Sequence, residues 1–180
     1  MCYCSVMKST TLLVMRHAKS DWNASHGSDF DRVLSGRGIS DAPRMGQWIV
    51  DQSYTPDQII CSPAQRVRET ILAAGKAWDQ DEDQIKWDHD IYNADLDKLL
   101  AIVAGDLKQG SINLLTGHNP GVSELILYLS GDRVPEQASD NLMPTAAVTI
   151  LKLANSDNPV NYGDWQIIDY MKPRLLSESL

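Results

Sequence analysis

One stretch near the amino terminus constrains the fold of this chain more than any other. Residues 12–15 are four consecutive apolar residues, and the run ends abruptly at Arg16 and His17. A short unbroken apolar run between polar residues favours a strand buried on both faces, as in a parallel sheet. Ligands of open α/β sheets bind just beyond the carboxyl ends of such strands. A functional site is therefore expected at Arg16 and His17, although a charged pair that only terminates a strand is the simpler alternative.

Strand-like and helix-like segments alternate along the rest of the chain. Further apolar runs predict strands at about 58–61, 85–87, 112–116, 146–153 and 165–170. Helical patterns predict helices from Ser35 or Ser40 to 51, and at about 62–78, 95–103 and 120–130. This alternation predicts an α/β fold, a three-layer sandwich with a mostly parallel central sheet and helices on both faces.

The length of 180 residues suits one domain with a sizeable core. We expect that domain to span residues 8–171, with a loose amino-terminal tail at 1–7 and a carboxy-terminal tail at 172–180. Residues 131–144 are expected to form irregular surface. The polar stretch 21–32 is long for a loop, which favours a functional role.

Charge and apolar runs limit the partners and the compartment. The net charge of −8 and the pI of about 4.8 oppose non-specific nucleic-acid binding, which needs a basic face. No apolar run approaches the ~20 residues of a membrane span, and the amino terminus lacks the apolar core of a signal peptide. Three cysteines are too few for a disulfide scaffold. We therefore expect a cytoplasmic protein with no nucleic-acid or membrane partner.

Three predicted strands end in residues that suit phosphate chemistry. Arg16 and His17 follow the first strand, Arg66 lies one turn into the helix after the second, and His118 follows the fourth. Because the carboxyl ends of parallel strands meet at one edge, these four side chains should converge. A guanidinium fork matches two phosphate oxygens, and helix amino termini attract anions. Read alone, Arg66 is a solvated helix residue and His118 a turn residue, but their joint placement predicts a phosphoryl site.

Other ligands fit this pattern less well. Arginine charge beside the histidines would repel a metal ion, and no close spacing of zinc ligands is present. The chain also lacks a glycine-rich phosphate loop followed by Lys and Ser or Thr, which disfavours a nucleotide hydrolase. One histidine could instead attack phosphorus directly, because neutral imidazole is a nucleophile. A hydrogen bond from its other ring nitrogen to a backbone carbonyl would fix the required tautomer.

These motifs resemble the histidine phosphatase superfamily, also called the phosphoglycerate-mutase-like fold. The family's Arg-His-Gly signature stands here as Arg16-His17-Ala18, and its Ser-Pro-x-x-Arg-x-x-x-Thr element matches residues 62–70. Residues 34–38 resemble its Leu-Thr-x-x-Gly segment, and residues 117–120 resemble its second histidine motif. The motifs occur in the family's order from residue 12 to about residue 130.

The resemblance implies a role for each matching position. His17 would be the nucleophile that becomes phosphorylated, and the remaining positions would hold the phosphoryl group or line the site: Arg16, Arg66, His118, Ser20 and Asn23. It implies no metal and no cofactor. The run from Arg16 to Trp22 and the short chain are similar to SixA-type phosphohistidine phosphatases, which implies phosphohistidine on a signalling protein as the substrate.

A general acid cannot be assigned with the same ease. Asp90 is the nearest candidate by sequence location, or it is a solvated loop charge. An imidazole leaving group needs less acid assistance than an alkoxide, so a missing acid would fit phosphohistidine. Two alternatives stay open: the same chemistry on a small phosphoester, including mutase activity, and a module that recognises phosphate without turnover. The partner is then a phosphorylated protein or a small phosphorylated substrate, and the oligomeric state is unknown.

Overall fold

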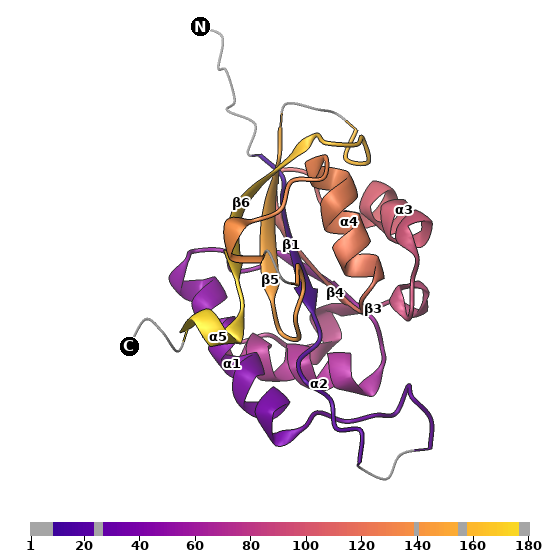
Figure 1. The fold of residues 1–180 in the computed structure, drawn as a ribbon, viewed down its shortest axis with the longest axis vertical. Coiled ribbons are helices and arrows are strands. Elements are labelled where there is room, and N and C mark those ends of the chain that lie inside the picture. Colours follow the sequence, from indigo (N-terminus) through magenta and orange to yellow (C-terminus); the bar gives the residue numbers. More distant parts are fainter. Residues whose placement is uncertain (1–8, 24–26, 139–140, 155–157, 177–180) are drawn as a thin grey trace, which may run out of the picture.

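The computed structural model describes residues 9–23, 27–138, 141–154 and 158–176 (Figure 1). The strands are β1 (Thr11–Arg16), β2 (Gln58–Cys61), β3 (Ile85–Trp87), β4 (Ile112–Gly117), β5 (Val148–Leu153) and β6 (Trp165–Met171). The α-helices are α1 (Gly36–Asp51), α2 (Gln65–Ala74), α3 (Leu96–Asp106), α4 (Gly121–Ser130) and α5 (Pro173–Leu176). Four 3-10 turns complete the described elements: Gly75–Trp78, Glu82–Gln84, His89–Ile91 and Glu136–Ala138. The expected amino-terminal tail, residues 1–7, lies outside the described residues.

The strands form one mixed sheet in the order β3-β2-β4-β1-β5-β6. The pairs β2–β3, β2–β4 and β1–β4 are parallel, whereas β5 is antiparallel to both β1 and β6. The sheet is thus mostly parallel, and its parallel part contains every strand that was expected to lead into the site. The predicted α/β class is confirmed.

The sheet separates two hydrophobic cores, as Figure 1 shows by the helices on either side of it. Leu12 and Val14 of β1 contribute to the core under α3 and α4. Leu13 and Met15 of the same strand contribute to the core under α1 and α2. This alternation explains the unbroken apolar run in the sequence, because successive side chains of a strand point to opposite faces and both faces are covered.

Helix α1 begins at the first of the two expected positions. The hydroxyl of Ser35 accepts a hydrogen bond from the amide of Gly38 and caps the helix, and Pro43 lies within its first half. Gly38 lies directly against the chain that follows β1, because an added Cβ would collide with the carbonyl oxygen of Lys19. The close approach at Gly38 thus fixes the start of α1 next to the end of β1.

Two local expectations were wrong. Helix α2 begins at Gln65 rather than Ser62, and its first residues are not capped by a side chain. The segment 131–144 is not only surface, because Ala138 and Met143 are buried. Within the segment 172–180, residues Pro173–Leu176 form α5, whose first residue is buried near α1.

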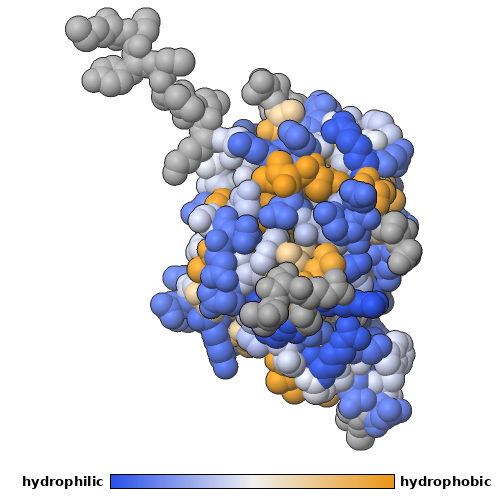
Figure 2. Space-filling model, turned by 60° about the vertical axis from the view of Figure 1, so that its left-hand side comes forward, coloured by the Kyte–Doolittle hydropathy of each residue, from blue (hydrophilic) through white to orange (hydrophobic). Residues whose placement is uncertain are grey.

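The surface seen in Figure 2 is mainly hydrophilic, with small and separate apolar patches. The large apolar side chains that are exposed lie far apart in the sequence: Trp22, Ile39, Val134, Tyr162 and Ile168. Within the part of the chain that the structure describes, no helix is both long and apolar enough to cross a membrane.

Candidate active site

The register of the sheet brings three strand ends together. Arg16 of β1 lies opposite Gly117 of β4, and Cys61 of β2 lies opposite Thr116 of the same strand. The residues that follow stay aligned, because the amide of His17 bonds the carbonyl of Gly117 at 3.2 Å and the amide of Ser62 bonds that of Thr116 at 3.1 Å. The prediction that these ends converge at one edge is confirmed.

His17 is held in one tautomer. Its Nδ1 atom lies 2.8 Å from the carbonyl oxygen of Ala18. A carbonyl can only accept, so Nδ1 carries the proton and Nε2 is the basic nitrogen of the neutral ring. Burial is the main cause that lowers the pKa of His17 to about 3; His118, Arg66 and Arg16 contribute in the same direction, and the bond to Ala18 opposes them. At neutral pH the ring is uncharged and its Nε2 carries a lone pair.

His118 is the second imidazole of the site. Its ring centroid lies 5.1 Å from that of His17. Arg66 donates from Nη2 to Nδ1 of His118 at 3.2 Å, which leaves Nε2 to donate to Ser62 Oγ at 2.9 Å. Burial, followed by the charge of Arg66, lowers the pKa of His118 to about 3. This ring is therefore also neutral and fixed at both nitrogens.

Arg66 lies in the first turn of α2 and is 2% exposed. Its Nη1 donates to the main-chain oxygen of Asp29 at 2.6 Å, and its Nη2 donates to Oδ2 of Asp29 at 3.0 Å. The carbonyl of Arg66 accepts from Thr70 Oγ1, which in turn accepts from the amide of Ala18. By contrast, Arg68 lies partly exposed over the ring of Trp87, away from the two histidines.

Arg16 is oriented by the segment that was expected to be only surface. Its Nη1 donates to the carbonyl oxygen of Met143 at 2.9 Å. Asn119 donates to the same carbonyl at 3.0 Å, so one main-chain oxygen connects the last residue of β1 with a residue that follows β4. The side-chain oxygen of Asn119 accepts from Ser123 Oγ, and α4 begins without a side-chain cap.

A cavity of about 290 Å³ opens between these residues. It is lined by all four predicted catalytic residues and by Ser20, which is held beside Leu34 by an isolated bridge. Asn23 does not line it: this residue is exposed, and its amide bonds the carboxylate of Asp21. Asp90 is also exposed and outside the lining.

The sequence reading missed three residues of this site. Asp29 and Arg32 line the cavity, and Tyr92 donates to Oδ2 of Asp29 at 3.1 Å. Arg32 is buried and pairs with Oδ1 of Asp29 at 3.0 Å. The signal for them in the sequence is the Asp-x-x-Arg spacing within the long polar stretch 21–32. In a turn, this spacing can bring a carboxylate and a guanidinium group into contact.

Three arginines, Arg16, Arg32 and Arg66, line this cavity, against the single carboxylate of Asp29 among the described lining residues. Among the described residues, the Nε atoms of Arg16, Arg32 and Arg66 are buried without a hydrogen-bond partner. Unsatisfied buried donors are costly and call for an acceptor. In the part of the chain that is described, no group of three or more histidine, cysteine or acidic side chains could hold a metal ion. The arrangement is suited to an oxyanion such as a phosphoryl group.

Comparison with known proteins agrees with this chemistry. Residues 12–97 match the model of the histidine phosphatase superfamily, branch 1. An uncharacterised protein of Mycobacterium leprae is 27% identical over 169 residues, which are 91% of this chain and 97% of that protein.

Solved structures share the fold over nearly the whole chain. A SixA-type protein from Agrobacterium tumefaciens has a TM-score of 0.78 and 29% identity, covering 91% of this chain and 98% of the other. The protein histidine phosphatase SixA complexed with tungstate has a TM-score of 0.72 at 20% identity, covering 92% and 99%, and shows likeness of fold alone. The residues that match the family model include the strand that leads to Arg16 and His17 and the helix that carries Arg66, so this chain is similar to branch 1 of the histidine phosphatase superfamily in the elements that build the site.

Proposed function

We propose that the protein is a phosphatase that works through a phosphorylated His17, with phosphohistidine on a signalling protein as its favoured substrate. One observation carries the proposal above the others. The Nδ1 atom of His17 is bonded to the Ala18 carbonyl, which leaves Nε2 as the unprotonated nitrogen of a ring beside two arginines and a second imidazole. A module that only binds phosphate would need the arginines but not a histidine prepared in this way.

The proposed reaction has two steps. In the first, the Nε2 lone pair of His17 attacks phosphorus, the bond from phosphorus to the substrate imidazole breaks, and water protonates the departing nitrogen. In the second, another water attacks phosphorus and gives a proton to the hydroxide left by the first step, the bond to Nε2 breaks, and inorganic phosphate leaves as the neutral ring is restored. Arg16 and Arg66 would stabilise charge on the non-bridging oxygens during both transfers.

The lack of an available acid at the cavity favours an imidazole leaving group. Among the described lining residues, Asp29 is the one carboxyl group. Burial raises the pKa of Asp29, but Arg66, Tyr92 and Arg32 together outweigh it and bring that pKa below its ordinary value. An ionised carboxylate in ion pairs cannot donate a proton, so an alkoxide leaving group would depart without assistance. Phosphoramidates do not need that proton to the same degree.

Trapping of the intermediate tests the proposal. Wild-type protein mixed with ³²P-labelled phosphoramidate and quenched in alkali should carry label that is lost on acid treatment. The variant His17→Asn, which keeps the size and the Nδ1-side donor, should carry no label and release no phosphate. Turnover retained in this variant would refute the proposal.

A substrate panel separates phosphohistidine from the alternatives. Phosphohistidine peptide and phosphoramidate should be hydrolysed with kcat/KM at least about 100-fold above that for alkyl phosphoesters, the size of a typical general-acid contribution. The reverse ranking would indicate a phosphoester phosphatase or mutase. Tight binding of phosphate with no turnover of any substrate would indicate a recognition module.

A further inference from the structure

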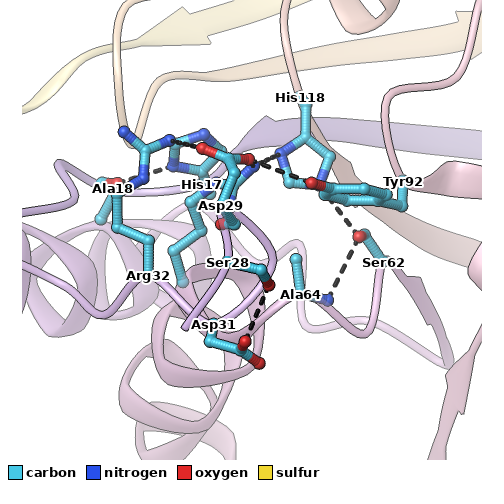
Figure 3. A network of polar contacts seen from close by, with 11 residues as sticks. His17, Ala18, Ser28, Asp29, Asp31, Arg32, Ser62, Ala64, Tyr92 and His118 are labelled. Atoms are coloured by element: carbon cyan, nitrogen blue, oxygen red, sulfur yellow. Dashed lines mark hydrogen bonds and ion pairs between the residues drawn. The ribbon is translucent and has the colours of Figure 1, made fainter. Parts of the chain in front are cut away.

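The carboxylate of Asp29 lies at the centre of the polar network shown in Figure 3, between Arg32 on one side and Tyr92 and His118 on the other. Its Oδ1 accepts from Arg32 at 3.0 Å, and its Oδ2 accepts from Arg66 at 3.0 Å and from Tyr92 at 3.1 Å. The main-chain oxygen of Asp29 accepts a second bond from Arg66 at 2.6 Å. One residue thus holds both terminal nitrogens of the Arg66 guanidinium.

Two residues that follow Asp29 in the sequence, Phe30 and Arg32, hold it in place. The carbonyl of Phe30 accepts from the amide of Gln65 at 3.0 Å, and the Phe30 ring packs edge-on against Tyr92 with centroids 5.0 Å apart. Arg32 is buried beneath the ring of Trp22, with its guanidinium carbon 3.6 Å from the ring centroid. The carboxylate is held in place although its side chain is 47% exposed.

A single path of contacts then leads from Asp29 to the second imidazole. Arg66 is anchored by Asp29 and donates to Nδ1 of His118, whose Nε2 donates to Ser62 Oγ. If Asp29 lost its charge, Nη2 of Arg66 would lose its carboxylate acceptor, and the main-chain oxygen of Asp29 alone would not prevent the guanidinium from rotating. Small displacements of groups that orient a reacting centre cost as much as about 100-fold in rate.

Asp29 orients Arg66 favourably, but its negative charge should weaken the binding of an anion in the cavity. Its carboxylate lines the same cavity that the phosphoryl group would enter, and like charges repel across such distances. A residue that orients Arg66 but repels the anion should therefore improve turnover while weakening the binding of phosphate. If Asp29 only stabilised the fold, its replacement would not lower turnover and strengthen phosphate binding at the same time.

We propose that Asp29, braced by Arg32 and Tyr92, is a positioning residue that orients Arg66 for phosphoryl transfer at the expense of ground-state affinity for phosphate. The proposal deepens the proposed phosphatase function and rests on it. Asp29 does not contact the reacting atoms in this proposal; it acts through Arg66.

The variant Asp29→Asn tests this, with Asp31→Asn as the matched control. Asparagine keeps the shape of aspartate but removes the charge and places a donor against the guanidinium groups. Asp31 lies two residues away in the same loop, and its carboxylate accepts from Ser28 Oγ instead of meeting the arginines (Figure 3). Steady-state turnover of phosphoramidate and calorimetric binding of inorganic phosphate are measured on the full chain for wild type and both variants.

In Asp29→Asn we expect kcat to fall about 10- to 100-fold, while inorganic phosphate binds about three- to tenfold more tightly. Asp31→Asn should change both values less than twofold. A fall in kcat with weaker phosphate binding would mean that the site has collapsed and would overturn the proposal. Unchanged kcat would overturn it as well.

Tyr92→Phe keeps the proposal falsifiable if the first variant does not fold. It removes one donor to Asp29 and leaves the charge in place, so kcat should fall about threefold with unchanged phosphate affinity, the loss of a single weak bond. Unchanged kcat in this variant would contradict the proposal that Tyr92 holds the Asp29 carboxylate in place. The calorimetric measurement of phosphate binding also separates the two proposals. If wild type has no turnover, the phosphatase proposal fails. Tighter phosphate binding in Asp29→Asn would then still support repulsion between the Asp29 carboxylate and the bound phosphate.

Discussion

The hydroxyl oxygen of Ser62 lies 2.9 Å from Nε2 of His118. A serine followed by proline favours a helix cap, but here the helix begins at Gln65, and the hydroxyl accepts from the imidazole and from the amide of Ala64. With Arg66 donating to Nδ1, the serine completes the fixation of the ring. The residue after β2 therefore orients a residue after β4, which only the parallel register of these neighbouring strands makes possible.

Replacing Ser62 with alanine should misorient His118. The buried Nε2–H would lose its acceptor, and the other tautomer would place a proton against the Arg66 donor. We expect kcat/KM to fall about tenfold, since an unsatisfied buried donor costs about 1–3 kcal/mol. Steady-state kinetics with phosphoramidate and ¹⁵N NMR of the ring nitrogens check this. Ser28→Ala, which removes only an exposed bond to Asp31, should leave both readouts unchanged.

Arg66→Lys should be far more damaging than Arg68→Lys. A lysine has one charged nitrogen and cannot contact the Asp29 main chain, the Asp29 carboxylate and His118 together as the fork of Arg66 does. We expect kcat/KM to fall at least about 100-fold, as when a transition-state donor is lost. Arg68 packs on Trp87 outside the cavity, and its variant should stay within twofold of wild type. Equal losses in the two variants would contradict the assignment of Arg66.

The pH profile should reflect the lowered pKa values of both histidines. The nucleophile must be neutral, and burial brings the pKa of His17 and of His118 to about 3. The fraction of neutral ring is then near one throughout pH 5–8, and activity from these groups is lost only as the pH falls towards 3. Measured kcat/KM, corrected for ionisation of the substrate, should be flat over that range. An acid limb with its midpoint near 6.5 would show that the rings titrate as exposed imidazoles do.

Sequence patterns located the site because its main parts follow from sheet geometry. Arg16 is the last residue of β1, and His17 and His118 directly follow β1 and β4. Arg66 lies in the first turn of the helix after β2, so the parallel register of these strands is sufficient to bring the four residues together. Ser20 and Asn23 were implied only by resemblance, and the two differ: the bridge to Leu34 holds Ser20 at the cavity, whereas Asn23 is exposed.

The remaining parts of the site leave a weak trace in the sequence. Arg16 is oriented by the main-chain oxygen of Met143, and a carbonyl has no side-chain signature. Asp29 belongs to a loop without periodicity, so only the folded contacts with Arg66 and Tyr92 distinguish it from Asp31. Sequence patterning therefore recovers the residues placed by regular elements and misses those placed by loops.

Gly46 should prove essential to the packing that supports this site. It lies on α1 where the helix crosses the carboxyl end of α2, and an added Cβ would lie 2.7 Å from Cα of Ala74 and closer still to its carbonyl oxygen. Backbone cannot give way as a flexible side chain can, so Gly46→Ala should lower the free energy of unfolding by about 1–3 kcal/mol or more. Gly105 of α3 has open space around it, and Gly105→Ala should raise that free energy by about 0.4–1 kcal/mol. Urea denaturation of both variants measures the contrast, and a Gly46→Ala protein as stable as wild type would show that α1 and α2 are not in this close contact.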